Sequence, residues 1–216
     1  MNNYNECINI NEDELKKYNK KTDEQCGKMV GISPCKESYF HLNVFSHIRS
    51  RLFWLIVLMA SAMAAGVIIT HYENVFEVVP LLVAFIPMLM ASGGNCGAQT
   101  STLIIRGIST KEINNSHIGK VFIKEATIAF LIGLILAILN SIWVIIVYDN
   151  VNIAIVVGLA LIGTIVVSKI LGCMLPFLAK PLKIDPAVMA TPLIMTIIDI
   201  FSVWLYFRIA ILVMGL

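Results

Sequence analysis

One carboxylate lies where a membrane-spanning helix has no structural need for one. Asp199 sits near the centre of an otherwise apolar run, residues 187–213. A charged side chain at the middle of a bilayer costs about 2.5–3.5 kcal/mol on insertion scales. Such residues usually face a bundle interior or an aqueous cavity, where they bind an ion, relay a proton or pair with another charge. Asp199 is therefore the first candidate functional residue.

A polar cluster interrupts a second apolar run. Residues 93–102 read Gly-Gly-Asn-Cys-Gly-Ala-Gln-Thr-Ser-Thr. The glycines alone would suit close helix packing, but that does not explain the amide and hydroxyl side chains beside them. Glycine also weakens a helix, so we expect a loosened backbone here. Such backbone is tolerated at this depth only inside protein or beside a water-filled cavity, which favours a pore-lining role.

The two anomalies predict one site. In the last run, Thr191, Met195, Asp199 and Ser202 are spaced to share one helical face. Counting from the ends of the two runs places Asn95 and Asp199 near the same depth. Carboxylate, amide, hydroxyl and carbonyl oxygens suit a hard cation such as Mg²⁺ or Ca²⁺.

A structural role for Asp199 is an alternative. Lys169 is the other near-central charge, and an Asp199–Lys169 ion pair would explain both residues without transport. Glu125, beside Lys124, is expected near the membrane boundary, solvated or lining a pore mouth. The cysteines and histidines show no metal-ligand spacing.

These residues must be positioned by membrane-spanning helices. The chain is 58% hydrophobic and only 14% charged, which is far from the composition of a soluble domain. Stretches of about 20 apolar residues can each cross the bilayer, and five qualify: residues 52–70, 78–105, 126–147, 153–178 and 187–213. We expect an all-α integral membrane protein with five transmembrane helices, preceded by a short interfacial helix from Phe40. Residues 1–39 form a polar tail, and residues 40–216 form the transmembrane domain.

The basic residues predict the orientation. Nearly all Lys and Arg lie in the N-terminal segment and in residues 106–124 and 180–185, whereas residues 71–77 and 148–152 carry none. The positive-inside rule then places the N-terminus and the tail in the cytoplasm and the C-terminus outside the cell membrane.

The chain resembles a known family, the transmembrane domain of the MgtE magnesium channels. The resemblance covers about residues 45–213. It is carried by Gly-Gly-Asn-Cys-Gly-Ala-Gln (93–99) with Thr-Leu-Ile-Ile-Arg (102–106), Phe-Ile-Lys-Glu (122–125), Met-Leu-Pro-Phe-Leu (174–178), and Asp-Pro-Ala (185–187) leading through Pro192 to Asp199. The ordered set is much more specific than any one motif.

The resemblance implies a homodimer in the lipid bilayer with the conduction path on its two-fold axis. Asp199 of each protomer would hold a largely hydrated Mg²⁺, and Asp185 would lie near the cytoplasmic mouth. The predicted metal-path residues are Asp199, Asn95, Thr102, Thr191, Met195, Gly94 and Asp185.

Two departures from the family stand out. Relatives often have Asn where this chain has Ala98 and Thr191, so selectivity among divalent cations stays open. Typical relatives also carry an N-terminal helical domain and a CBS pair that sense cytoplasmic Mg²⁺. The polar tail is too short to encode them, so we expect either no such regulation or a separate regulatory partner.

We therefore expect a channel or transporter, not an enzyme, that moves Mg²⁺ into the cytoplasm down its electrochemical gradient, with no nucleic-acid partner. No P-loop is present to couple transport to ATP. A proton- or ion-coupled exchanger with Asp199 as carrier is the main alternative. A non-conducting subunit is another. An intramembrane aspartyl hydrolase would need two carboxylates sharing a proton, which only a dimer could bring together.

Overall fold

The computed structural model describes residues 43–179 and 186–215. The helices of this part of the chain are α2 (Val44–His71), α3 (Glu73–Val78), η1 (Pro80–Phe85), α4 (Ile86–Ser109), η2 (Asn115–His117), α5 (Ile118–Tyr148), α6 (Val151–Ala179) and α7 (Pro186–Met214). They form five segments long and apolar enough to cross a membrane, with η1 and α4 together making the second. The predicted all-α, five-span fold is confirmed.

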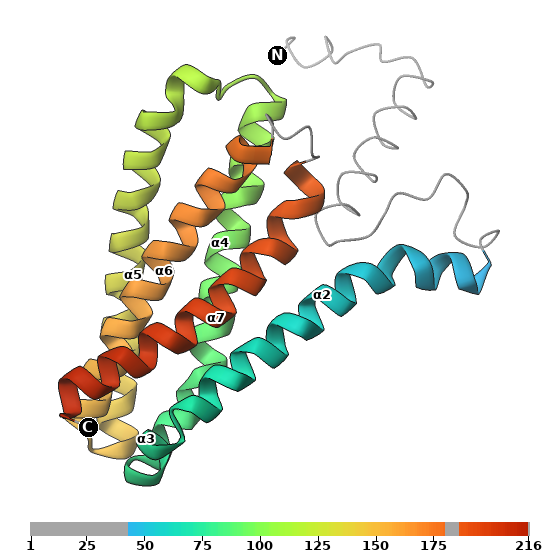
Figure 1. The fold of residues 1–216 in the computed structure, drawn as a ribbon. Coiled ribbons are helices and arrows are strands. Elements are labelled where there is room, and N and C mark those ends of the chain that lie inside the picture. The colour runs from blue at the N-terminus through green and yellow to red at the C-terminus, as the bar shows by residue number, and fades with distance from the viewer. Residues whose placement is uncertain (1–42, 180–185, 216) are drawn as a thin grey trace, which may run out of the picture.

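The bundle is built around α6. Helices α4, α5 and α7 all pack against α6, and α4 also packs against α7 (Figure 1). At the end of the bundle near the C-terminus, Tyr206 and Phe207 are fully buried. The Tyr206 hydroxyl donates a hydrogen bond of 3.0 Å to the carbonyl oxygen of Leu82, which ties α7 to η1.

Helix α2 diverges from the others. It packs mainly against α7 and leans away from the bundle toward its N-terminal end (Figure 1). The segment expected to be a short interfacial helix is helical from Val44 and continues without a break into the first span. Phe40, where that helix was expected to begin, lies outside the described residues.

The glycine cluster does not loosen the second span. Helix α4 is continuous from Ile86 to Ser109, so the expectation of a weakened backbone was wrong. A Cβ atom on Gly97 would lie 2.5 Å from both Ile194 Cγ2 and Ser168 Oγ. The missing side chain therefore lets α6 and α7 approach α4. Tertiary packing of this kind supplies more helix stability than intrinsic propensity does.

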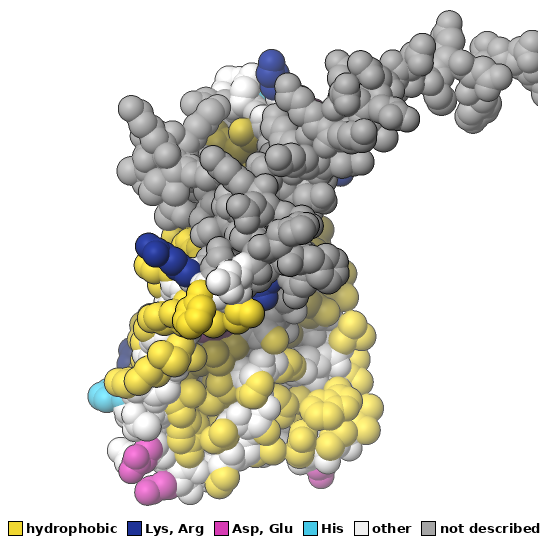
Figure 2. Space-filling model, turned by 90° about the vertical axis from the view of Figure 1, so that its right-hand side faces the viewer, with side chains coloured by type: hydrophobic (Ala, Val, Ile, Leu, Met, Phe, Trp, Pro, Cys, Tyr) yellow, Lys and Arg dark blue, Asp and Glu magenta, His cyan; other side chains and the backbone are white. Residues whose placement is uncertain are grey.

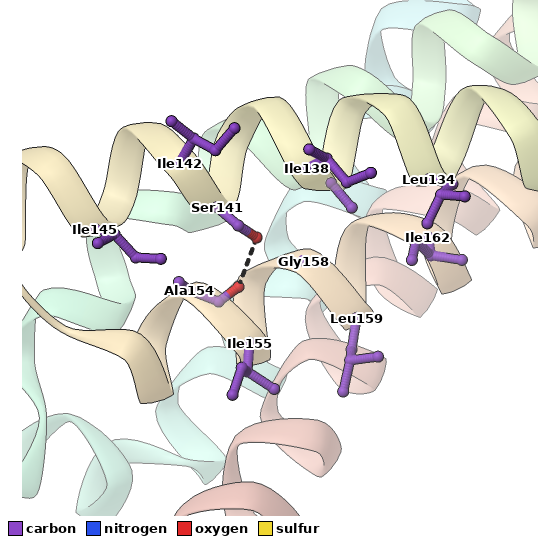
Figure 3. A pocket seen from close by; sticks show the side chains of 11 residues that line it. Leu134, Ile138, Ser141, Ile142, Ile145, Ala154, Ile155, Gly158, Leu159 and Ile162 are labelled. Atoms are coloured by element: carbon purple, nitrogen blue, oxygen red, sulfur yellow. Dashed lines mark hydrogen bonds between the residues drawn. The ribbon is translucent and has the colours of Figure 1, made fainter.

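A shallow groove runs along the seam between α5 and α6 (Figure 3). It has a volume of about 350 Å³ and is lined almost entirely by aliphatic side chains such as Leu134, Ile155 and Leu159. Its one side-chain hydroxyl, on Ser141, donates to the carbonyl oxygen of Ala154 at 3.1 Å. The groove therefore suits a lipid acyl chain and offers a cation no charged ligand.

Charge separates along the bundle. One end holds Arg106 and the α4–α5 connection with Lys111, and the opposite end holds Glu73, Glu77 and Asp149. Figure 2 shows the carboxylates at the lower end and most Lys and Arg side chains above them. The separation read from the sequence is thus preserved in three dimensions.

Candidate ion-conduction site

One face of α4 presents polar side chains to the outside of the protomer. Asn95, Gln99 and Thr102 are all exposed, and their spacing of four and three residues places them on one helical face. Lipid can neither donate to an amide nor accept from it, so this face is costly to leave against hydrocarbon. It must border water or another protein surface.

The opposite face of α4 is held inside the bundle. Gly93, Gly97, Thr100 and Ser101 are buried. The Ser168 hydroxyl on α6 donates a hydrogen bond to the carbonyl oxygen of Gly93. These contacts fix the rotation of α4 about its axis and so keep the polar face turned outward.

Helix α7 supplies the carboxylate. Asp199 and Met195, one turn apart, are both half-buried. Ser202 is buried, and its hydroxyl donates to the backbone carbonyl of Asp199 at 3.1 Å. Thr191 belongs to α7, but its side chain is outside what the structure describes, and Asp185 lies outside the described residues.

The contact between α4 and α7 brings most of the predicted residues together. A Cβ atom on Gly94 would lie 3.5 Å from Met195 Cγ, so these two positions face each other. Asp199 is four residues beyond Met195, an offset of about 6 Å along the helix. Asn95, which follows Gly94, is therefore about one turn from the level of Asp199. Thr102 lies about two further turns along α4.

The near-central lysine has a different partner from the one considered above. Lys169 Nζ lies 3.7 Å from Glu125 Oε2 and donates a hydrogen bond of 3.0 Å to Thr100 Oγ1. The alternative of an Asp199–Lys169 pair is therefore wrong. Within the described ranges, no Lys or Arg forms an ion pair with Asp199.

Glu125 is buried. The expectation that it lies near the membrane boundary, solvated or lining a pore mouth, was therefore wrong. The apolar window of the third span starts after Glu125, but α5 begins at Ile118 and places Glu125 two turns inside the helix. The exposed residues Lys120 and Lys124 occupy other faces of the same turns. Counting depth from the first possible helical residue, rather than from the first apolar one, could have revealed this.

A single protomer offers few ligands to a metal. Among the described residues, no three His, Cys, Asp or Glu side chains gather into a possible metal site. Cys96 and Cys173 are buried free thiols. A cation near Asp199 would therefore meet one carboxylate per protomer together with amide, hydroxyl and water oxygens.

Comparison with known proteins gives a consistent assignment. A family model described as "Divalent cation transporter" (MgtE) matches residues 86–209, from α4 to α7. The magnesium transporter MgtE of Thermus thermophilus is 33% identical over 164 residues, which cover 74% of this chain and 36% of that protein. The protein of the same name from Bacillus subtilis is 33% identical over 175 residues, covering 81% and 39%. That of Enterococcus faecalis is 28% identical over 188 residues, covering 87% and 42%. The chain thus spans less than half the length of each of these relatives.

Proposed function

The chain belongs to the MgtE family of divalent cation transporters, and on this premise we propose that two copies of it form a pore that conducts Mg²⁺. One observation carries the proposal. Asp199, half-buried and without a described cationic partner, lies about one turn from the exposed polar face of α4 that begins at Asn95. A carboxylate that has no cationic partner among the described residues, and that lies near exposed amide and hydroxyl groups inside the membrane span, fits an aqueous cation path.

A second copy completes the site. An isologous dimer sets the same surface of each protomer against its partner across a two-fold axis. With α4 and α7 facing the axis, Asn95, Gln99 and Thr102 of both copies are withdrawn from lipid. Two Asp199 carboxylates then face one cavity and balance the charge of one Mg²⁺. Because Mg²⁺ gives up its water reluctantly, it binds through few carboxylates and keeps several waters.

The ion path follows from the arrangement of charges. Glu73, Glu77 and Asp149 raise the local cation concentration at the outer end. The ion then passes Asp199 and Gly94 and continues along the polar face of α4 to the cytoplasmic end. We place the end that bears Arg106 and Lys111 in the cytoplasm, in accord with the positive-inside rule. A membrane potential of 100 mV, negative inside, then contributes about 4.6 kcal/mol for a divalent ion.

The test is flux through the purified chain alone. Liposomes that contain the protein and a Mg²⁺-sensitive dye should fill when Mg²⁺ and an inside-negative potential are applied. Asp199→Asn should remove most of this flux, because it keeps the shape of the side chain but loses its charge. Glu112→Gln is the control, since it removes an exposed carboxylate in the α4–α5 connection. Full flux in the Asp199 variant would refute the proposal.

Asp199, which has no cationic partner in the part of the chain that the structure describes, also suits a proton-coupled exchanger. The two functions differ in one measurement. Flux through a channel follows the Mg²⁺ gradient and the potential alone, whereas an exchanger with Asp199 as carrier also accumulates Mg²⁺ when only a pH gradient is imposed.

A further inference from the structure

Three helices share a buried charge network behind the proposed ion path. Glu125 on α5 and Lys169 on α6 form an ion pair of 3.7 Å, and only 12% and 5% of their side chains are exposed. Thr100 on α4 joins both residues. Its hydroxyl donates to Glu125 Oε2 at 3.2 Å and accepts from Lys169 Nζ at 3.0 Å.

The network touches α4 on its buried side. Thr100 is fully buried, whereas Thr102, two residues on, is exposed. At 100° per residue, the two side chains point in nearly opposite directions. The charges therefore lie behind α4, separated from its exposed polar face by about the 10 Å diameter of one helix.

The two charges have opposite consequences for a cation at that distance. Alone, the Lys169 ammonium would repel any cation on the other side of α4, and a divalent ion twice as strongly as a monovalent one. Little water or salt reaches a buried site to screen this field. Glu125 places a negative charge within 4 Å of the ammonium and cancels most of its field along the path.

We propose that Lys169, Thr100 and Glu125 form a neutral clamp that fixes the rotation of α4, with Glu125 required for divalent flux because it cancels the charge of Lys169. The inference rests on the proposed ion path along α4. Lys169 and Glu125 act through α4 and through their field, so they are positioning and electrostatic residues and not ligands of the ion.

The sign of each charge makes the proposal testable. Glu125→Gln leaves Lys169 unbalanced, and Mg²⁺ flux should fall about tenfold. Lys169→Met removes the repelling charge, and flux should stay within about threefold of the unmodified protein. The double variant is neutral again, so flux should return to within about threefold, since replacing both members of a buried pair is often tolerated. Glu112→Gln, at an exposed carboxylate in the α4–α5 connection, is the control for the chemical change.

A role in packing alone predicts another pattern. In that case both single variants lose flux to a similar extent and the double variant does not recover, which would overturn the proposal. If Glu125→Gln yields no folded protein, the double variant still decides, because a folded double variant that does not conduct also refutes it.

A second readout separates this proposal from the proposed function. Thermal unfolding of the purified variants tests the clamp without reference to transport. Glu125→Gln should lower Tm, and the double variant should regain most of the loss, because it leaves no buried charge unpaired. If the Tm losses of Glu125→Gln and Lys169→Met simply add up in the double variant, the pair is not coupled. If the unmodified protein carries no Mg²⁺ although this coupling is present, the proposed function fails and the clamp remains.

Discussion

Gly97 of α4 and Gly172 of α6 pack so closely that a Cβ atom on Gly172 would overlap the carbonyl oxygen of Gly97. The obstacle is backbone, so it cannot move aside by changing a rotamer. This contact sets the closest approach of the two helices that carry Thr100 and Lys169.

The first prediction concerns this contact. Gly172→Ala should force α4 and α6 apart and lower stability by about 1–3 kcal/mol, the usual cost of overpacking. Thermal unfolding of purified protein measures the change. Gly66→Ala is the matched control, because a Cβ atom there meets nothing within 4 Å. It should leave Tm unchanged or raise it slightly, since alanine favours the helix. An unchanged Tm for Gly172→Ala would mean that the two helices do not meet as described.

The second prediction separates two adjacent glycines. A Cβ atom on Gly93 would lie 2.5 Å from Ile198 Cγ2 and 2.6 Å from Thr164 Cγ2, whereas one on Gly94 meets Met195 Cγ at 3.5 Å. Gly93→Ala should therefore lower Tm. Gly94→Ala should fold normally and reduce Mg²⁺ flux, because the added methyl group borders the proposed path. If Gly94→Ala lowers Tm as much as Gly93→Ala, the assignment of Gly94 to the path loses its support.

The third prediction concerns the exposed face of α4. Asn95→Ala should change Tm little, because the side chain is exposed, but it should reduce Mg²⁺ flux by removing an oxygen from the path. Leu103→Ala truncates another exposed residue of the same helix and should leave flux near that of the unmodified protein. Equal losses of flux in both variants would point to a general effect on α4.

The fourth prediction concerns the end of the bundle near the C-terminus. Tyr206→Phe removes the hydroxyl that binds the carbonyl oxygen of Leu82, and it should lower stability by about 1 kcal/mol. Tyr148→Phe, at a more exposed position, should have a smaller effect. Thermal unfolding again gives the comparison, and equal shifts for the two variants would contradict the prediction.

The sequence predicts the spans well because the length of an apolar run is a local property. Asp199 could be identified in the same way, since a charge in such a run is visible without any knowledge of its neighbours. The pairing of Lys169 with Glu125 could not, because it depends on which faces of α5 and α6 meet. The helical conformation of residues 93–97 could not be predicted from the local sequence either. The low helix propensity of glycine predicted a weak helix. In the structure, Gly93 and Gly97 allow α6 and α7 to pack closely against α4, and this packing keeps α4 regular.

The divergence of α2 has a mechanical consequence. Because α2 packs mainly on α7, a force that tilts α2 within the bilayer acts first on the helix that carries Asp199. The Ser61 hydroxyl donates to the carbonyl oxygen of Thr196 at 3.1 Å, which is less than one turn from that carboxylate. A change in the tilt of α2 would therefore reach the backbone beside Asp199 through this contact before it reached the helices that α2 contacts less.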